Sequence, residues 1–179
     1  VVIPTYNRLP ILQKCLLALE AQDPAAEITG YEVVLVDDGS TDATVSWLRQ
    51  HSLQLPHLRL IEQEHGGPAQ GRNRGVEAAR GDVVVFIDSD LVVTPSFLRC
   101  HAVALEREWQ RRGNRLCFTY GAVINTANFQ DPCSEPHKLQ DHSFAYFATG
   151  NVAIDRQLLE QAGLFDTLSL IHISEPTRP

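Results

Sequence analysis

Two short apolar runs, each ending in acidic residues, most restrict how this chain can fold. Residues 32–38 read EVVLVDD and residues 83–90 read VVVFIDSD. A run that is apolar without alternation is typical of a strand covered on both faces, as in a parallel sheet that lies between helices. The two runs therefore predict an α/β fold in which acidic residues follow directly on buried strands.

Four such runs occur in the first part of the chain, and segments with helical spacing separate them. We predict strands at residues 1–3, 32–36, 58–61 and 83–87. Strands that alternate with helices form parallel sheets through right-handed crossovers, so their carboxyl ends meet at one edge. Ligands of open α/β sheets bind outside that edge. We expect three polar segments to converge there, at residues 4–7, 37–40 and 88–90.

Apolar spacing and capping residues predict the helices between these strands. We expect one helix over residues 12–19, a second from the turn at residues 37–40 through residue 48, and a third from the loop at residues 66–68 to about residue 79. A fourth is expected to start after residue 94. Gly81 is the expected C-cap of the third helix, and Thr94 with Pro95 the N-cap and first residue of the fourth. Further along, residues 115–124 are expected to form a strand and residues 125–141 a long loop.

Composition restricts the function classes. The 179 residues suit one domain, with 44% hydrophobic and 21% charged residues, as in ordinary globular proteins. The net charge of −7 argues against nucleic acid as a main partner, because a binder of the phosphate backbone needs a basic face. The seven histidines show no metal-ligand spacing, and no C-x-x-C pair indicates zinc or redox chemistry among the cysteines, which are Cys15, Cys100, Cys117 and Cys133.

Asp88 and Asp90 lie one residue apart at the end of a buried strand. Carboxylates placed so closely repel each other and attract a cation. Mg²⁺ and Mn²⁺ prefer oxygen ligands and can bridge a carboxylate to a diphosphate. The pair therefore indicates a divalent metal site for a nucleotide. An ordinary alternative is a solvated turn in which an aspartate caps the next helix, and D-x-D alone does not decide between the two.

The other polar segments have ordinary alternatives too. In residues 37–42 (DDGSTD), Ser40 or Thr41 can cap the next helix while Gly39 takes an unusual backbone angle. Tyr6 follows a strand-ending proline and can pack on a planar base. Residues 66–73 (GGPAQGRN) match neither G-x-x-x-x-G-K-[ST] nor G-x-G-x-x-G, which leaves a helix N-terminus near the ligand, with Arg72 available for charge or stacking.

Three segments in this order closely resemble glycosyltransferase family two, over residues 1 to about 107. They read VVIPTYNR, VVLVDDGSTD and GGPAQGRNRGVEAARGDVVVFIDSD. Residues 149–154 (TGNVAI) and 162–166 (AGLFD) resemble the acceptor-side segment of that family. The resemblance implies a GT-A fold, a Rossmann-like and mostly parallel sheet with helices on both faces. It also implies inverting transfer of a sugar from a UDP-, GDP- or dTDP-linked donor to an acceptor hydroxyl, assisted by Mg²⁺ or Mn²⁺.

The resemblance implies roles for the donor side of the site. Pro4 and Tyr6 would line the nucleobase pocket. Asp38 would hydrogen-bond the base, with Asp37 at its side. Arg72 would lie near the base or the diphosphate.

It also implies roles around the transferred sugar. Asp88 would contact the ribose or the sugar, and Asp90 would ligate the metal. Gly150 and Asn151 would lie by the transferred sugar or the acceptor. The general base of the family comes from an acidic motif after the segment that ends here at Asp166, so we assign no catalytic base.

The last twelve residues, LSLIHISEPTRP, continue no earlier pattern and resemble a translated sequencing adapter. We therefore expect residues 1–167 to be a catalytic domain of glycosyltransferase family two, truncated at both ends, and residues 168–179 to be a non-native tail. A natural polar tail is the alternative. On the first interpretation the fragment lacks its catalytic base and binds its donor weakly.

Two other functions stay open. A sugar-nucleotide nucleotidyltransferase has a similar sheet but a Gly-rich, Arg-containing loop after the first strand, where this chain has PTYNR. A non-catalytic domain that binds nucleotide sugars is the second alternative.

The acceptor would be a saccharide, a lipid or another hydroxyl compound. No apolar run approaches the roughly 20 residues of a membrane span, so we expect a cytoplasmic protein, with attachment to the cytoplasmic membrane face through missing parts left open.

Overall fold

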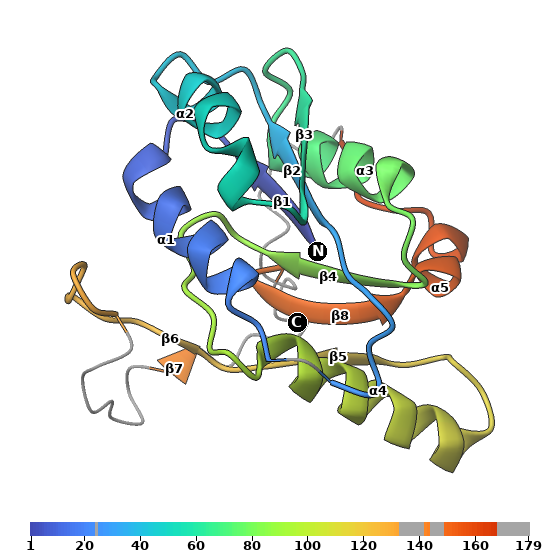
Figure 1. The fold of residues 1–179 in the computed structure, drawn as a ribbon. Helices are drawn as coiled ribbons and strands as arrows, with labels where there is room; N and C mark the ends of the chain where they lie inside the picture. The colour runs from blue at the N-terminus through green and yellow to red at the C-terminus, as the bar shows by residue number, and fades with distance from the viewer. Residues whose placement is uncertain (24, 133–141, 144–148, 168–179) are drawn as a thin grey trace.

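A six-stranded mixed sheet forms the centre of the computed structural model, which describes residues 1–23, 25–132, 142–143 and 149–167 (Figure 1). The strand order is β3-β2-β1-β4-β8-β5. These strands are β1 (Val2–Thr5), β2 (Val33–Asp37), β3 (Leu58–Glu62), β4 (Val83–Ile87), β5 (Phe118–Tyr120) and β8 (Asn151–Asp155). Two further strands, β6 (Val123–Ile124) and β7 (His142–Ser143), pair with each other.

The four strands predicted from apolar runs are confirmed, with ends that differ by at most two residues. They are mutually parallel, and the register pairs Val2 with Val34 and Leu35 with Leu60. The other two strands run antiparallel, since β8 pairs with β4 and β5 pairs with β8. The mostly parallel α/β sheet is thus confirmed, with an antiparallel extension on the β4 side.

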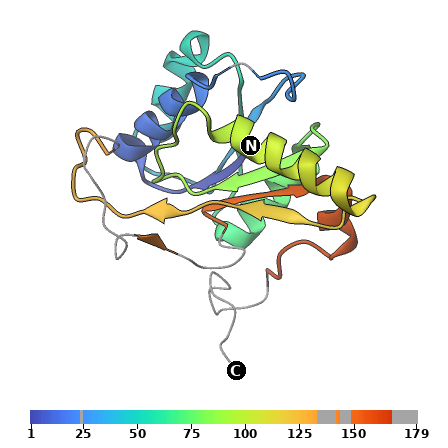
Figure 2. The ribbon, with the colours of Figure 1, turned by 90° about the horizontal axis from the view of Figure 1, so that it is seen from below.

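Helices cover both faces of the sheet, as Figures 1 and 2 show. The helices are α1 (Leu9–Glu20), α2 (Thr44–Gln50), α3 (Pro68–Ala78), α4 (Phe97–Arg112) and α5 (Arg156–Gln161), with a 3₁₀ turn at Ser52–Gln54. Alternate residues of each buried strand enter different cores. One core joins the strands to α1, α2 and α4 through Ile3, Leu35, Leu16, Leu48 and Leu98. The other joins them to α3 and α5 through Val2, Val34, Phe86, Val76 and Leu159.

Three predicted helix ends are wrong. The fourth helix begins at Phe97 with Ser96 as N-cap, because residues 94–97 first form a turn in which the Phe97 N–H donates to the Thr94 carbonyl at 3.0 Å. The third helix ends at Ala78, and its cap is Ala79 in extended backbone rather than Gly81. The second helix begins at Thr44, whose N–H donates to Asp42 Oδ1 at 2.9 Å, so neither Ser40 nor Thr41 caps it.

The segment from residue 115 to residue 124 contains two short strands and not one, because β5 ends at Tyr120 and β6 starts at Val123. The expected loop at residues 125–141 has no helix or strand in residues 125–132, the part of it that the structure describes. Cys133 and the proposed tail at residues 168–179 lie outside the described residues. Cys15, Cys100 and Cys117 are free thiols. Across the described ranges, every helix is too short or too polar to cross a membrane.

Candidate functional site

The loops after β1, β2 and β4 meet at the carboxyl edge of the sheet. Asn7 has a left-handed backbone (φ 52°), and its Oδ1 accepts from the N–H groups of Thr41 and Asp42 at 2.8 and 3.1 Å. The next residue, Arg8, forms an ion pair with Asp90 after β4. The β1 loop therefore bridges both acidic turns, and the three polar segments converge as the sheet topology predicts.

Asp38 is almost fully buried, with 3% of its surface exposed, and both carboxylate oxygens are occupied. Oδ1 accepts from Gln63 Nε2 at 2.7 Å and from the Gly66 N–H at 2.9 Å. Oδ2 accepts from the Gly67 N–H at 2.9 Å and lies 2.9 Å from His65 Nδ1. The two glycine N–H groups before α3 are therefore bound by protein, which argues against their use as a phosphate cradle. Asp38 organises this turn.

Two aromatic rings lie beside the Asp38 turn. Tyr6, 42% exposed, packs against His65 in a tilted arrangement, with ring centroids 4.4 Å apart and an interplanar angle of 31°. His65 Nδ1 also lies 3.1 Å from the Asp38 carbonyl, so this nitrogen faces two acceptors and carries the proton. The sequence offered no motif for Gln63 or His65, and only their place between a strand and a Gly-Gly pair could have indicated them.

Pro4 and Asp37 belong to the strands and are buried. Pro4 pairs with Val36 and lies under α3, where a Cβ added to Gly71 would come within 3.1 Å of Pro4 Cβ. Asp37 Oδ2 accepts from the Ser40 N–H at 2.9 Å and closes the acidic turn. Among the described residues, neither Asp37 Oδ1 nor Thr5 Oγ1 on the adjacent strand has a hydrogen-bond partner. Pro4 and Asp37 thus lie behind the exposed edge of the site.

Asp88 lies between Arg72 and Gly150. Arg72 Nη2 donates to Asp88 Oδ1 at 2.7 Å, and the side chains are 13% and 43% exposed. Pairing of Ile87 with Asn151 brings Gly150 beside Asp88, so that a Cβ on Gly150 would lie 3.2 Å from Asp88 Oδ2. The tertiary structure therefore brings together the two segments that resemble the donor and acceptor sides of the family.

The Asn151 side chain is held by two neighbours. Its Nδ2 donates to the Ala122 carbonyl at 3.2 Å, and its Oδ1 lies 2.8 Å from His101 Nε2. Because a carbonyl only accepts, His101 Nε2 must carry the proton, and His101 Nδ1 accepts from Thr119 Oγ1 at 2.8 Å. Burial lowers the pKa of His101, which favours this neutral form. No pattern in the sequence indicated His101.

Asp90 and Arg8 form an ion pair at the surface, with side chains 44% and 54% exposed. Exposed pairs of this kind contribute about 0–1 kcal/mol, so Asp90 can exchange Arg8 for another cation at little cost. Burial, followed by the charges of Asp90 and Asp88, raises the pKa of the Cys15 thiol to about 12.

The residues present fit a divalent ion that is shared with a substrate. Within the described ranges, no group of three or more His, Cys, Asp or Glu side chains could hold a metal by itself. Mg²⁺ usually binds through one or two carboxylates together with substrate phosphates, and Asp90 suits such an arrangement.

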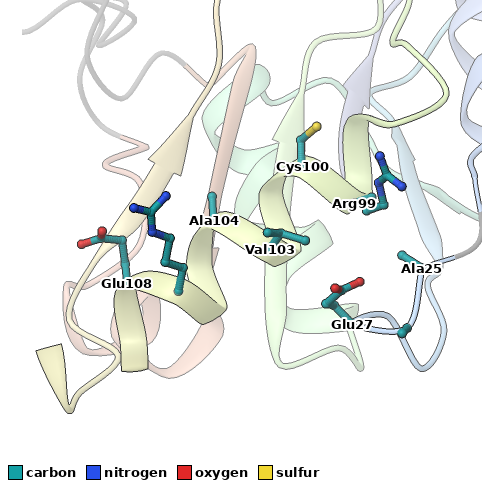
Figure 3. A pocket seen from close by; sticks show the side chains of 9 residues that line it. Ala25, Glu27, Arg99, Cys100, Val103, Ala104 and Glu108 are labelled. Atoms are coloured by element: carbon teal, nitrogen blue, oxygen red, sulfur yellow. The ribbon is translucent and has the colours of Figure 1, made fainter. Parts of the chain in front are cut away.

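Two cavities lie away from the carboxylates of the site, although His101 also lines the second of them. One, of about 610 Å³, lies between residues 25–27 and the outer face of α4, where Arg99, Cys100 and Val103 line it (Figure 3). Another, of about 320 Å³, is lined by Val1, Glu32, Trp109 and Arg115, among others, at the amino ends of the central strands. The candidate site lies on the open carboxyl edge of the sheet and in neither cavity.

Comparison with known proteins shows the family of this chain. The family model described as "Glycosyl transferase family 2" matches residues 1–161. An uncharacterized glycosyltransferase of Escherichia coli, YibD, is 36% identical over 96 residues, which are 54% of this chain and 27% of YibD. The poly(ribitol-phosphate) beta-N-acetylglucosaminyltransferase TarS of Staphylococcus aureus is 35% identical over 109 residues, which are 59% of this chain and 18% of TarS.

Solved structures are similar over nearly the whole chain. Residues 1–349 of S. aureus TarS match with a TM-score of 0.69 at 25% identity, covering 97% of this chain and 51% of that one. A mannosyltransferase from Pyrobaculum calidifontis, in complex with GDP-Man and Mn²⁺, matches with a TM-score of 0.65 at 28% identity, covering 93% and 47%. This chain thus spans about half of the solved chains and less than a third of the curated relatives.

Proposed function

This chain belongs to glycosyl transferase family 2, and from that premise we propose that it forms the donor-binding part of an enzyme that moves a sugar from a nucleoside-diphosphate sugar to an acceptor hydroxyl. One observation carries the proposal: Tyr6, the Arg72–Asp88 pair, Asp90 and Gly150 meet at the carboxyl edge of one sheet. Solved relatives in complex with UDP-GlcNAc and with GDP-Man support a nucleotide-sugar donor.

The Tyr6 side of the site is proposed to bind the nucleobase. Tyr6 is exposed and backed by the His65 ring, so its outer face can stack on a planar base. The sequence led us to expect that Asp38, with Asp37 at its side, hydrogen-bonds the base, but Asp38 is buried and its oxygens accept from protein groups. Asp38 is therefore proposed to act on the base indirectly, by holding the turn before α3 that carries His65 beside Tyr6. Pro4 supports the loop from below.

The carboxylates after β4 are proposed to bind the diphosphate and the sugar. Arg72 orients Asp88, which would contact the ribose or the sugar, and Asp90 would hold a Mg²⁺ or Mn²⁺ ion together with the diphosphate. When bound, the ion stabilises the negative charge that develops on the departing nucleotide. If the ion took the place of Arg8 on Asp90, the Arg8 guanidinium would be free to contact a phosphate oxygen.

The Gly150 side is proposed to accommodate the transferred sugar. Without a side chain, Gly150 leaves space beside Asp88 Oδ2, and Asn151 follows in a fixed orientation. In the proposed reaction an acceptor hydroxyl attacks the anomeric carbon as the bond to the diphosphate breaks on the opposite side, which inverts the configuration at this carbon. The hydroxyl proton passes to a general base. We assign no general base among residues 1–167.

Calorimetry with UDP and with GDP, each with Mn²⁺, tests the proposal. The wild-type chain should bind one of them only when Mn²⁺ is present, and Asp90→Ala should lose this dependence together with most of the affinity. Asp82→Ala is the matched control, because Asp82 is an exposed aspartate at the opposite end of β4. Equal affinity of the wild type and Asp90→Ala for a nucleotide would refute the assignment of Asp90, and absence of all nucleotide binding would refute the function.

A further inference from the structure

Asn73 of α3 joins the donor side of the site to the segment after α5. Its Nδ2 donates to the Phe165 carbonyl at 2.8 Å, and its Oδ1 accepts from the Phe165 N–H at 3.0 Å. One amide side chain therefore satisfies both backbone groups of a residue 92 positions away. Phe165 lies in no helix or strand, so its backbone gains from Asn73 the pair of bonds that a strand neighbour would provide.

The backbone before Phe165 has an unusual conformation. Gly163 and Leu164 have φ angles of 93° and 62°, and a leucine in this region is uncommon. Such a conformation persists when the surrounding contacts over-determine it. The Leu164 N–H donates to the Leu159 carbonyl at 3.4 Å on the α5 side, and Asn73 holds the other side. These contacts give the Phe165 ring a defined place.

The Phe165 ring lies between the core and Arg72. Phe86 in β4 meets it edge-on, with centroids 5.2 Å apart and an interplanar angle of 89°. The Arg72 guanidinium carbon lies 5.9 Å from the ring centroid, within the range of a cation–π contact. The ring thus supports the guanidinium from one side.

Arg72 needs this support because Asp88 holds it at one nitrogen only. Nη2 donates to Asp88 Oδ1 at 2.7 Å, whereas the buried Nε has no hydrogen-bond partner among the described residues. A single contact leaves the plane of a guanidinium undetermined, unlike a two-point contact. Since Arg72 is mostly buried and Asp88 is half-exposed, the packing around Arg72 decides where its charge points.

We infer that Asn73 and Phe165 are positioning residues, which hold the Arg72 guanidinium against Asp88 and so couple the segment after α5 to the donor-binding carboxylates. The inference rests on the proposed function, because the affinity for a nucleotide is its readout. In the folded protein Arg72 neutralises Asp88, which lies one residue from the second carboxylate, Asp90. When Arg72 is released, these two carboxylates repel each other and the site is less well ordered for a diphosphate.

Asn73→Ala tests the inference, with Asn114→Ala as the matched control. Asn114 also donates to a backbone carbonyl, that of Arg112 at 3.4 Å, and accepts from a backbone N–H, that of Leu116 at 3.0 Å. Its bonds are local and exposed. By calorimetry with UDP or GDP and Mn²⁺, Asn73→Ala should bind about fivefold more weakly than the wild type, and Asn114→Ala should bind equally well. A wild type that binds neither nucleotide refutes the proposed function, whereas binding by Asn73→Ala equal to that of the wild type overturns this inference alone.

A double-mutant cycle separates positioning from a general structural effect. If Asn73 acts through Arg72, Asn73→Ala should weaken binding no further in an Arg72→Ala background. The same fivefold loss in both backgrounds would overturn the inference. Phe165→Leu keeps the backbone bonds to Asn73 and removes the ring, so it should weaken binding about threefold. If Asn73→Ala shows no cooperative thermal transition, Phe165→Leu decides, and wild-type affinity in that variant would overturn the inference.

Discussion

Asp38 is the buried carboxylate on which the turn before α3 depends, and Asp38→Asn perturbs it at constant shape. One carboxylate oxygen becomes an NH₂ group, whereas the native oxygens receive the N–H groups of Gly66 and Gly67 and contacts from Gln63 and His65. If the remaining oxygen keeps Gly66 and Gln63, the new NH₂ group faces the Gly67 N–H. Two donors then meet where a donor and an acceptor met before.

The expected loss is about 3 kcal/mol of unfolding free energy. A hydrogen bond to a charged group contributes about 1.5–3 kcal/mol, and a buried N–H without an acceptor costs about 1–3 kcal/mol. The His65 contribution is small because its side chain is 59% exposed and can hydrogen-bond to water instead. For a chain of this size the loss corresponds to a fall in Tm of roughly 6–12 °C.

Thermal denaturation followed by circular dichroism measures this effect. Asp42→Asn is the control, since it removes a charge from an exposed position of the same turn, and the asparagine Oδ1 can still accept from the Thr44 N–H. The nucleotide affinity of Asp38→Asn should fall as well, while the dependence on Mn²⁺ is retained. A Tm within about 2 °C of the wild type would show that the carboxylate does not hold the turn, and the reasoning from burial would then be wrong.

Three other outcomes are expected. Gly75→Ala should lower the unfolding free energy by about 1–2 kcal/mol in urea denaturation, because its Cβ would lie 2.3 Å from Val2 Cγ1 and this overlap outweighs the roughly 1 kcal/mol gain in helix propensity. Gly71→Ala, whose Cβ would lie 3.1 Å from Pro4 Cβ, should lower it less. The reverse order of the two variants would contradict the packing of α3 on β1. Burial depresses the pKa of His101 below 6.5, so the unfolded chain binds the proton more readily, and stability should fall as the pH drops through about 6.5 toward the pKa of the folded protein. The urea midpoint of His101→Gln should fall less than that of the wild type between about pH 7.5 and 5.5. An identical fall in the two proteins would contradict this expectation. In native protein a thiol reagent should label exposed Cys100 while sparing Cys15, whose buried thiol has a pKa of about 12, and labelling of Cys15 at a comparable rate would contradict its burial.

The side-chain partners at the site were the least predictable part. Asn73 and Phe165 are 92 residues apart, and His101 and Asn151 are 50 apart. Such pairs depend on how α3, α4 and β8 pack, and hydrophobic periodicity carries no information about this. Arg8 could have been suspected as a cation next to an acidic edge, but only the fold shows that it reaches Asp90.

By itself the sequence determined the four parallel strands, the covering of both sheet faces, the positive φ of Gly39 and the meeting of three polar loops at one edge. These features follow from apolar runs and turn residues, which are local, and from the handedness of crossovers, which is general. Only the tertiary structure decided that β8 enters antiparallel beside β4 and places Gly150 against Asp88. The direction and neighbours of a strand follow from the free energy of burying it against the rest of the sheet. The sequence of a five-residue strand such as Asn151–Asp155 does not determine its direction or its neighbours.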